Sequence, residues 1–140
     1  MEGSRFRNPC LMNPMNDPTT KVIVDTNLWI DFLRQPELEL RAMIKQERVL
    51  TCPCVIGEVM VGSPRNRISI RQFLLRLPFA TEATFGEVLK MIESRNLYGS
   101  GLQWNDVILI AAAKLSSARL WTRDKRLAAT ADEFGIGWFE

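Results

Sequence analysis

KVIVDTN, residues 21–27, places the pattern of a buried strand directly before an acid. Its three β-branched residues, VIV, favour a strand, and the run ends at Asp25, which Thr26 and Asn27 follow. Two interpretations are open at this point. Asp25 could cap the helix that begins after it, or the strand could deliver a carboxylate to the edge of a sheet, where α/β proteins place their sites. The rest of the chain has to decide between them.

Around this stretch, short strand patterns alternate with helical ones. Strands are predicted over 21–25, 49–51 and 119–122, with a last one over 136–139, and helices over 28–33, 37–47, 55–62, 68–77, 83–97, 102–118 and 124–135. Short strands separated by helices predict a three-layer α/β/α domain with a central, mainly parallel sheet. We expect that domain to span 21–140. Residues 1–20 hold three of the seven prolines and little periodicity, which predicts a flexible N-terminal extension.

The composition limits the chemistry more than the net charge does. A chain of 140 residues, 46% hydrophobic and 24% charged, has the size and balance of one globular domain. It contains no histidine, which removes Ser-His and Cys-His triads and nearly all zinc catalysis. Oxygen ligands remain, and these suit Mg²⁺ or Mn²⁺. Three cysteines without a disulfide pattern, no secretory signal and no apolar run of about 20 residues predict a cytoplasmic protein without a membrane span.

Four acids lie within or directly beside apolar segments, where a charged residue is not needed for solubility. Glu58 lies in VIGEVMVG, a helix that is otherwise apolar apart from two glycines and that we expect to be buried. A buried carboxylate needs a partner, and a metal ion is favoured here over a buried arginine. Asp106 precedes the apolar run VILIAAA, and Asp124 follows strand LWT just as Asp25 follows VIV. Taken singly, each of these three aspartates could equally cap or stabilise a helix.

Parallel topology brings the four acids together. Strands of a parallel sheet end at the same edge, so Asp25 and Asp124 meet there. Crossover helices begin at that edge, which adds the first turns that hold Glu58 and Asp106. Carboxylates packed so closely cannot all stay ionised without cations. Four independent caps would predict no such convergence, so the four acids together predict a site for Mg²⁺ or Mn²⁺.

In this order and spacing, the four segments resemble the motifs of PIN-domain ribonucleases, and most closely those of the VapC-type toxins. The resemblance covers residues 21–139. VIVDTNLWID resembles the first motif, CVIGEVMVG the segment with the family glutamate, GLQWNDVILIAAA the third motif and LWTRDKRL the fourth. It implies that the catalytic, metal-binding acids are Asp25, Glu58, Asp106 and Asp124. The residues that it implies as supports for these acids are Thr26, Asn27 and Thr122.

The resemblance further implies a Mg²⁺- or Mn²⁺-dependent endoribonuclease, the toxin of a toxin–antitoxin pair, that hydrolyses RNA phosphodiester bonds with a metal-activated water. It implies a cognate antitoxin as partner, RNA as substrate, and a homodimer or toxin–antitoxin hetero-oligomer. Three basic residues beside Asp124 are candidate RNA-phosphate contacts: Arg123, Lys125 and Arg126. With the four acids set aside, 18 basic residues face 12 acids, and the remaining charge of +6 favours a polyanion.

Two alternatives to this function remain open. A non-catalytic RNA- or protein-binding PIN-like module would keep the fold without the reaction, but loss of an acid would be expected there, and all four are present. A haloacid dehalogenase-type phosphatase also places an aspartate after its first strand, but it normally needs a second acid where Asn27 stands. Trp104 could stack a base beside Asp106, although the apolar run around it favours a structural role.

Overall fold

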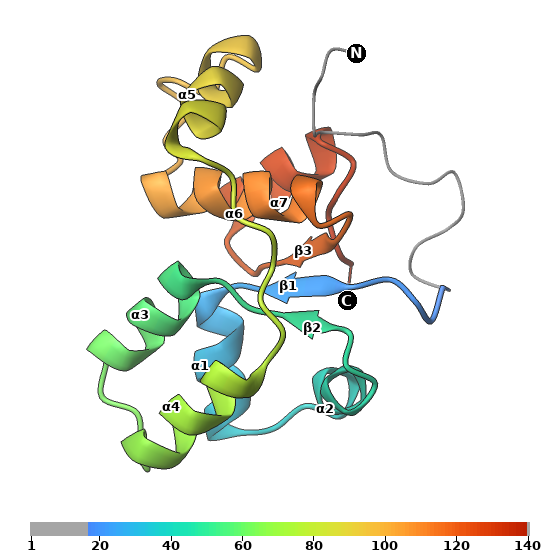
Figure 1. Ribbon diagram of the computed structural model, residues 1–140, viewed down its shortest axis with the longest axis vertical. Coiled ribbons are helices and arrows are strands. Elements are labelled where there is room, and N and C mark those ends of the chain that lie inside the picture. The colour runs from blue at the N-terminus through green and yellow to red at the C-terminus, as the bar shows by residue number, and fades with distance from the viewer. Residues whose placement is uncertain (1–16, 140) are drawn as a thin grey trace.

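A three-stranded parallel sheet lies at the centre of the protein (Figure 1). The computed structural model describes residues 17–139. The strands are β1 (Val22–Val24), β2 (Val49–Leu50) and β3 (Arg119–Trp121), in the order β2-β1-β3. Both neighbours run parallel to β1, with Ile23 opposite Leu50 on one side and Leu120 on the other. The parallel sheet that the sequence predicts is therefore confirmed.

Seven helices in the described part of the chain flank this sheet. They are α1 (Thr26–Arg34), α2 (Leu38–Lys45), α3 (Pro53–Val61), α4 (Arg67–Arg76), α5 (Phe85–Ser94), α6 (Trp104–Leu115) and α7 (Lys125–Glu133). In Figure 1, α1 to α4 lie on the β2 side of the sheet and α5 to α7 on the β3 side. Each helix falls where the sequence predicts one, and the α/β class is confirmed. Within residues 17–139, none of the helices combines the length and the apolar character needed to cross a membrane.

The central strand is the most deeply buried element. Val22, Ile23 and Val24 have no exposed surface. Three consecutive alanines of α6 are also fully buried, at 111–113, where the helix packs on β3 and β1. Their small side chains let the helix backbone come close to the strands. Because β1 lies inside the core, the residue directly after it, Asp25, leaves the core at the carboxyl edge of the sheet, where its backbone N–H donates to Trp121 O at 2.9 Å.

The C-terminal segment pairs with β3 but does not form the predicted strand over 136–139. Leu120 N donates to Ile136 O at 2.7 Å, and Trp138 N donates to Leu120 O at 3.0 Å. The pairing amounts to one isolated bridge, between Leu120 and Gly137. Glycine inside a strand weakens it because it has no side chain to pack, and here it occupies the centre of the paired segment.

Helix α3 corrects one expectation, because it is not wholly buried. Val55 and Val59 are buried, but Val61 is 89% exposed and Glu58 is also exposed. The helix packs against α1 and α4, and its remaining face meets solvent. The prediction that Glu58 is buried was therefore wrong. An apolar composition does not reveal whether a helix has neighbours on every side.

Most of the predicted N-terminal extension, residues 1–16, lies outside the described residues, as does residue 140. Its last four residues, 17–20, form a turn against Arg48. The Arg48 guanidinium donates to Thr20 O at 2.9 Å from Nε and to Asp17 O at 3.2 Å from Nη2. These contacts fix the direction in which the chain enters β1.

Candidate active site

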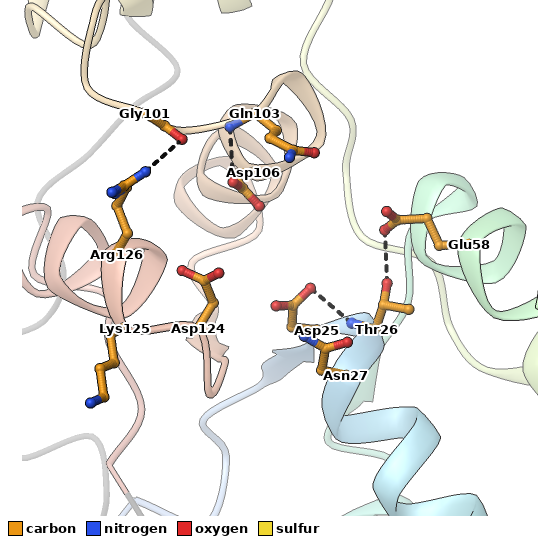
Figure 2. A pocket seen from close by; sticks show the side chains of 10 residues that line it. All are labelled: Asp25, Thr26, Asn27, Glu58, Gly101, Gln103, Asp106, Asp124, Lys125 and Arg126. Carbon is orange, nitrogen blue, oxygen red and sulfur yellow. Dashed lines mark hydrogen bonds between the residues drawn. The ribbon is translucent and has the colours of Figure 1, made fainter.

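A cavity of about 820 Å³ opens at the carboxyl edge of the sheet, and all four predicted acids line it (Figure 2). The acids come from four segments: the ends of β1 and β3, and the helices α3 and α6. The complete lining is Asp25, Thr26, Asn27, Glu58, Gly101, Gln103, Asp106, Asp124, Lys125 and Arg126. The convergence that parallel topology predicts is thus present in the structure. We call this cavity the acid pocket.

Asp25 is the deepest acid of the pocket, with 8% of its surface exposed. Thr122 Oγ1 donates to its Oδ2 at 2.7 Å, and Thr26 N donates to its Oδ1 at 2.8 Å. Burial raises the pKa of Asp25 above its ordinary value, and the negative charges of Asp106 and Glu58 raise it further, while the two hydrogen bonds oppose the rise. The Asp25 carboxylate therefore interacts electrostatically with two of the other acids of the pocket.

Asp124 is joined to Asp25 through one hydroxyl group. Thr122 Oγ1 accepts from Asp124 N at 3.1 Å while it donates to Asp25. The Asp124 carboxylate lies at the N-terminus of α7, where its Oδ1 accepts from Leu127 N at 2.9 Å. The capping role that the sequence left open is therefore real for Asp124, as it is for Asp25 at the N-terminus of α1. It does not remove the residue from the pocket, because the other carboxylate oxygen is not used in this cap.

The two acids on helices are held by more exposed hydrogen bonds. Asp106 lies in the first turn of α6, and its Oδ2 accepts from Gln103 N at 2.9 Å. Glu58 Oε1 accepts from Thr26 Oγ1 at 2.8 Å. Figure 2 shows Glu58 reaching from α3 toward the start of α1, across the pocket from Asp124. Glu58 thus belongs to the pocket even though the burial argument that first singled it out is wrong.

The basic residues beside Asp124 separate into two groups. Lys125 and Arg126 line the acid pocket, and Arg126 Nη1 donates to Gly101 O at 3.3 Å. Arg123 instead forms ion pairs with Asp31 at 3.0 Å and with Glu37 at 2.6 Å. Its guanidinium therefore joins the last turns of α1 to the start of α2. This arrangement argues against the predicted phosphate contact for Arg123, because its charge already faces two carboxylates.

Two lining residues were not singled out in the sequence, Gly101 and Gln103. Gln103 stands at the N-cap position of α6, three residues before Asp106, and that spacing could have identified it. Gly101 could not have been found in this way, because its place in the pocket depends on α7. Trp104, considered above for stacking, is 44% exposed and contacts Phe85 with the ring centroids 5.7 Å apart. It is not among the residues that line the pocket.

The donors of the acid pocket suit a hard divalent cation. Carboxylate oxygens from four segments surround the cavity, and oxygen is the ligand that Mg²⁺ and Mn²⁺ prefer. Among residues 17–139, no three ligand side chains are grouped tightly enough to hold an ion as they stand. Each of the four carboxylates instead accepts at least one hydrogen bond from the chain. The chemistry of the donor set therefore fits a metal ion, and the exposed side chains have room to turn toward one.

Comparisons with known proteins identify the family and the fold. The model of the PIN domain family matches residues 22–133. The ribonuclease VapC32 from two strains of Mycobacterium tuberculosis, CDC 1551 / Oshkosh and ATCC 25618 / H37Rv, is 36% identical over 120 residues, which cover 85% of this chain and 97% of the relative. Among solved structures, PAE2754 from Pyrobaculum aerophilum matches with a TM-score of 0.54 at 15% identity, over 91% of this chain and 99% of that one. At that identity, the last likeness concerns the fold alone.

Proposed function

The chain belongs to the PIN-domain family, among its VapC-type ribonucleases, and from this premise we propose that it is a Mg²⁺- or Mn²⁺-dependent endoribonuclease and the toxin of a toxin–antitoxin pair. The observation that carries the proposal is the convergence of four carboxylates from four separate segments on one cavity. The absence of histidine from the sequence is consistent with it, because hydrolysis with a metal-activated water needs no side-chain nucleophile.

The acids that would hold the metal are Asp25, Glu58, Asp106 and Asp124. A divalent cation at this place would supply Lewis acidity toward the phosphodiester and activate a water for attack. Asp25 is the fixed member of the set, because it is buried and accepts two hydrogen bonds. Glu58 is held by one exposed hydrogen bond from Thr26, so its side chain can turn toward a metal ion at a small cost in free energy. Thr122 positions Asp25 and the start of α7 relative to each other.

The proposed substrate is RNA, and the proposed protein partner is a cognate antitoxin. Lys125 and Arg126 line the pocket beside the acids, which places positive charge where the phosphates of RNA would approach. The relative that supports RNA as the substrate is named a ribonuclease. A homodimer or a hetero-oligomer with the antitoxin is part of the same proposal.

Cleavage assays test the proposed activity. Purified protein is incubated with single-stranded RNA in Mg²⁺, in Mn²⁺ or in EDTA, and cleavage is expected only with metal. Asp106→Asn should lose most of the activity, because it removes a charge from the pocket while keeping the side-chain shape. Asp132→Asn is the matched control: Asp132 is an exposed acid of α7 that does not line the pocket. Cleavage that persists in EDTA, or equal loss in both variants, would refute the proposal.

Thermal unfolding with Mn²⁺ separates the enzyme from a non-catalytic module without metal. Ligand binding stabilises the folded state by RT ln(1 + [L]/Kd), or about 2.7 kcal/mol at a Mn²⁺ concentration of 100 Kd. The wild-type protein should show this gain, and Asp106→Asn should lose most of it. A wild-type protein that gains nothing from Mn²⁺, or variants that gain as much as it does, would argue for a binding module.

A further inference from the structure

The guanidinium of Arg126 lies against the backbone of Gly101 at the rim of the acid pocket. Arg126 Nη1 donates to Gly101 O at 3.3 Å, and both residues line the cavity. Gly101 has φ of +88°, a conformation that favours glycine. A Cβ added there would stand 2.8 Å from Arg126 Cζ and closer still to Nη1. A side chain at Gly101 would therefore require the Arg126 guanidinium to move from the position that it occupies here.

We propose that Arg126 binds a phosphate of the substrate chain on the α7 side of the acid pocket, and that Gly101 is the positioning residue that holds it there. The inference rests on the proposed function, because it identifies the anion as a phosphate of single-stranded RNA. It adds a role for Gly101, which is not one of the acids, and it separates Arg126 from its two basic neighbours.

The direction of the side chains supports this separation. In Figure 2, Arg126 extends from α7 toward Gly101 and the start of α6, while Lys125 points the other way. Arg123 is engaged by two carboxylates outside the pocket. Of these three basic residues, Arg126 is therefore the one that lies between the α6 and α7 sides of the rim.

The chemistry of the guanidinium suits a phosphate. Arginine carries five N–H donors in a planar fork that matches two phosphate oxygens. One donor is used on a backbone carbonyl, which leaves others free to point outward. This contact also favours an orientation of the guanidinium toward the rim before substrate arrives. An RNA strand that approaches four carboxylates is repelled by them, and the positive charge of Arg126 at the rim offsets that repulsion.

Binding measurements on an inactive background test the proposal without cleavage. The Asp25→Asn protein is titrated with a fluorescently labelled single-stranded RNA at several salt concentrations. Loss of one phosphate contact lowers the slope of log K against log[salt] by about 0.7 for a single strand. Arg126→Ala should show that change and bind about 10-fold more weakly, as expected for a hydrogen-bonded charge. Arg126→Lys should keep most of the slope because it keeps the charge.

Gly101→Ala, on the same background, should also weaken RNA binding but keep more of the salt slope than Arg126→Ala does, because its methyl group would displace the guanidinium without removing its charge. The matched control is Gly99→Ala. Gly99 lies in the same loop and also has positive φ, +69°, but a Cβ added there would meet nothing within 4 Å. The two substitutions impose similar backbone strain, so only the contact with Arg126 differs. Thermal unfolding of both variants verifies that they are folded.

A double-mutant cycle decides the coupling between the two residues. In the Arg126→Ala protein, Gly101→Ala should weaken RNA binding no further. Full additivity, an equal effect of Gly99→Ala, or an unchanged salt slope in Arg126→Ala would overturn the inference. The outcome stays distinct from failure of the proposed function, which would appear as absence of metal-dependent cleavage by the wild-type protein. If Gly101→Ala does not fold, the salt slopes of Arg126→Ala and Arg126→Lys still decide the role of Arg126.

Discussion

The two sides of the acid pocket are built differently. On the strand side, Asp25, Thr122 and Asp124 follow β1 and β3, and one buried hydroxyl links the Asp25 carboxylate to the Asp124 backbone. On the helix side, Glu58 and Asp106 project from α3 and α6, and each is held by one hydrogen bond that water can reach. The first arrangement fixes Asp25 and Thr122 through the core, although the Asp124 side chain is exposed, and the second leaves both of its carboxylates adjustable.

This difference indicates that the two sides have different roles in the proposed enzyme: the strand side supplies a ligand in a fixed position and the helix side supplies ligands that can move. A metal site needs at least one ligand in a fixed position, and second-layer hydrogen bonds supply that order. It also needs ligands that can move, because no three carboxylates among residues 17–139 are grouped closely as they stand. We therefore expect substitutions on the strand side to have larger effects than those on the helix side.

The largest effect is expected for Asp25→Asn. Substitutions of residues that merely support a metal ligand cost about 10- to 100-fold, so loss of the fixed ligand itself should reduce kcat/KM by about 100-fold or more. The fold should survive, because asparagine keeps the shape and can still accept a hydrogen bond from Thr26 N. RNA cleavage rates and far-UV circular dichroism measure the two results. Cleavage within a few-fold of the wild type would exclude Asp25 from the reaction.

A pair of threonine variants compares the two sides directly. Thr122→Val removes the hydroxyl that donates to Asp25 and accepts from Asp124 N; we expect activity to fall by about 10- to 100-fold and stability by about 1–3 kcal/mol from the unsatisfied buried group. Thr26→Val removes only the exposed bond to Glu58, and its effect on both should be smaller. Urea unfolding and cleavage rates provide the measurements. If Thr26→Val is as damaging as Thr122→Val, the distinction between fixed and adjustable sides is wrong.

The stability of the metal-free protein should depend on pH through Asp25. Burial raises its pKa in the folded protein above the ordinary value of 3.8, so the folded state holds this proton more tightly than the unfolded state. The resulting stability is complete below pH 3.8, and it decreases as pH rises through the folded pKa, by at most about 1.4 kcal/mol per pH unit for one proton. Urea unfolding in EDTA, compared between wild type and Asp25→Asn, measures the effect. As pH rises through the folded pKa of Asp25, the free energy of unfolding of the wild type should fall relative to that of Asp25→Asn. A difference between the two proteins that does not change with pH would contradict this prediction.

The smallest effect is expected for Glu58→Gln in the absence of metal. Glu58 is exposed and its one hydrogen bond is also exposed, so the free energy of unfolding should change by no more than about 0.5 kcal/mol. The same variant should nevertheless lose part of the stabilisation by Mn²⁺. Thermal unfolding with and without Mn²⁺ compares the two conditions. A large loss of stability without metal would mean that Glu58 has a structural role on the helix side.

Much of the fold follows from local patterns in the sequence. The run VIV predicts β1, and the alternation of strands with helices predicts the parallel sheet that the structure contains. Parallel topology then requires that residues after β1 and β3 meet at one edge. For this reason, the arrival of Asp25 and Asp124 in one pocket could be predicted without any side-chain coordinates.

Exposure could not be predicted in the same way. The composition of α3 is strongly apolar, yet Val61 and Glu58 face solvent because α1 and α4 cover only part of the helix. The predicted strand at 136–139 likewise depends on a neighbour, and it reaches only one bridge to Leu120. In each case the local sequence permits more than one environment, and the number of neighbouring elements selects between them.

The sequence by itself determined the order of the elements, the lack of histidine and the four acids at one sheet edge, because these depend on periodicity and on the direction of parallel strands. Only the tertiary structure decided which of the basic residues beside Asp124 line the pocket and which does not. Arg123 meets Asp31, which is 92 residues away, and Arg126 meets Gly101, which is 25 residues away. Such pairings depend on how α1, α6 and α7 pack. An arginine side chain is long and can reach groups in several directions, so the sequence around it does not identify its partner.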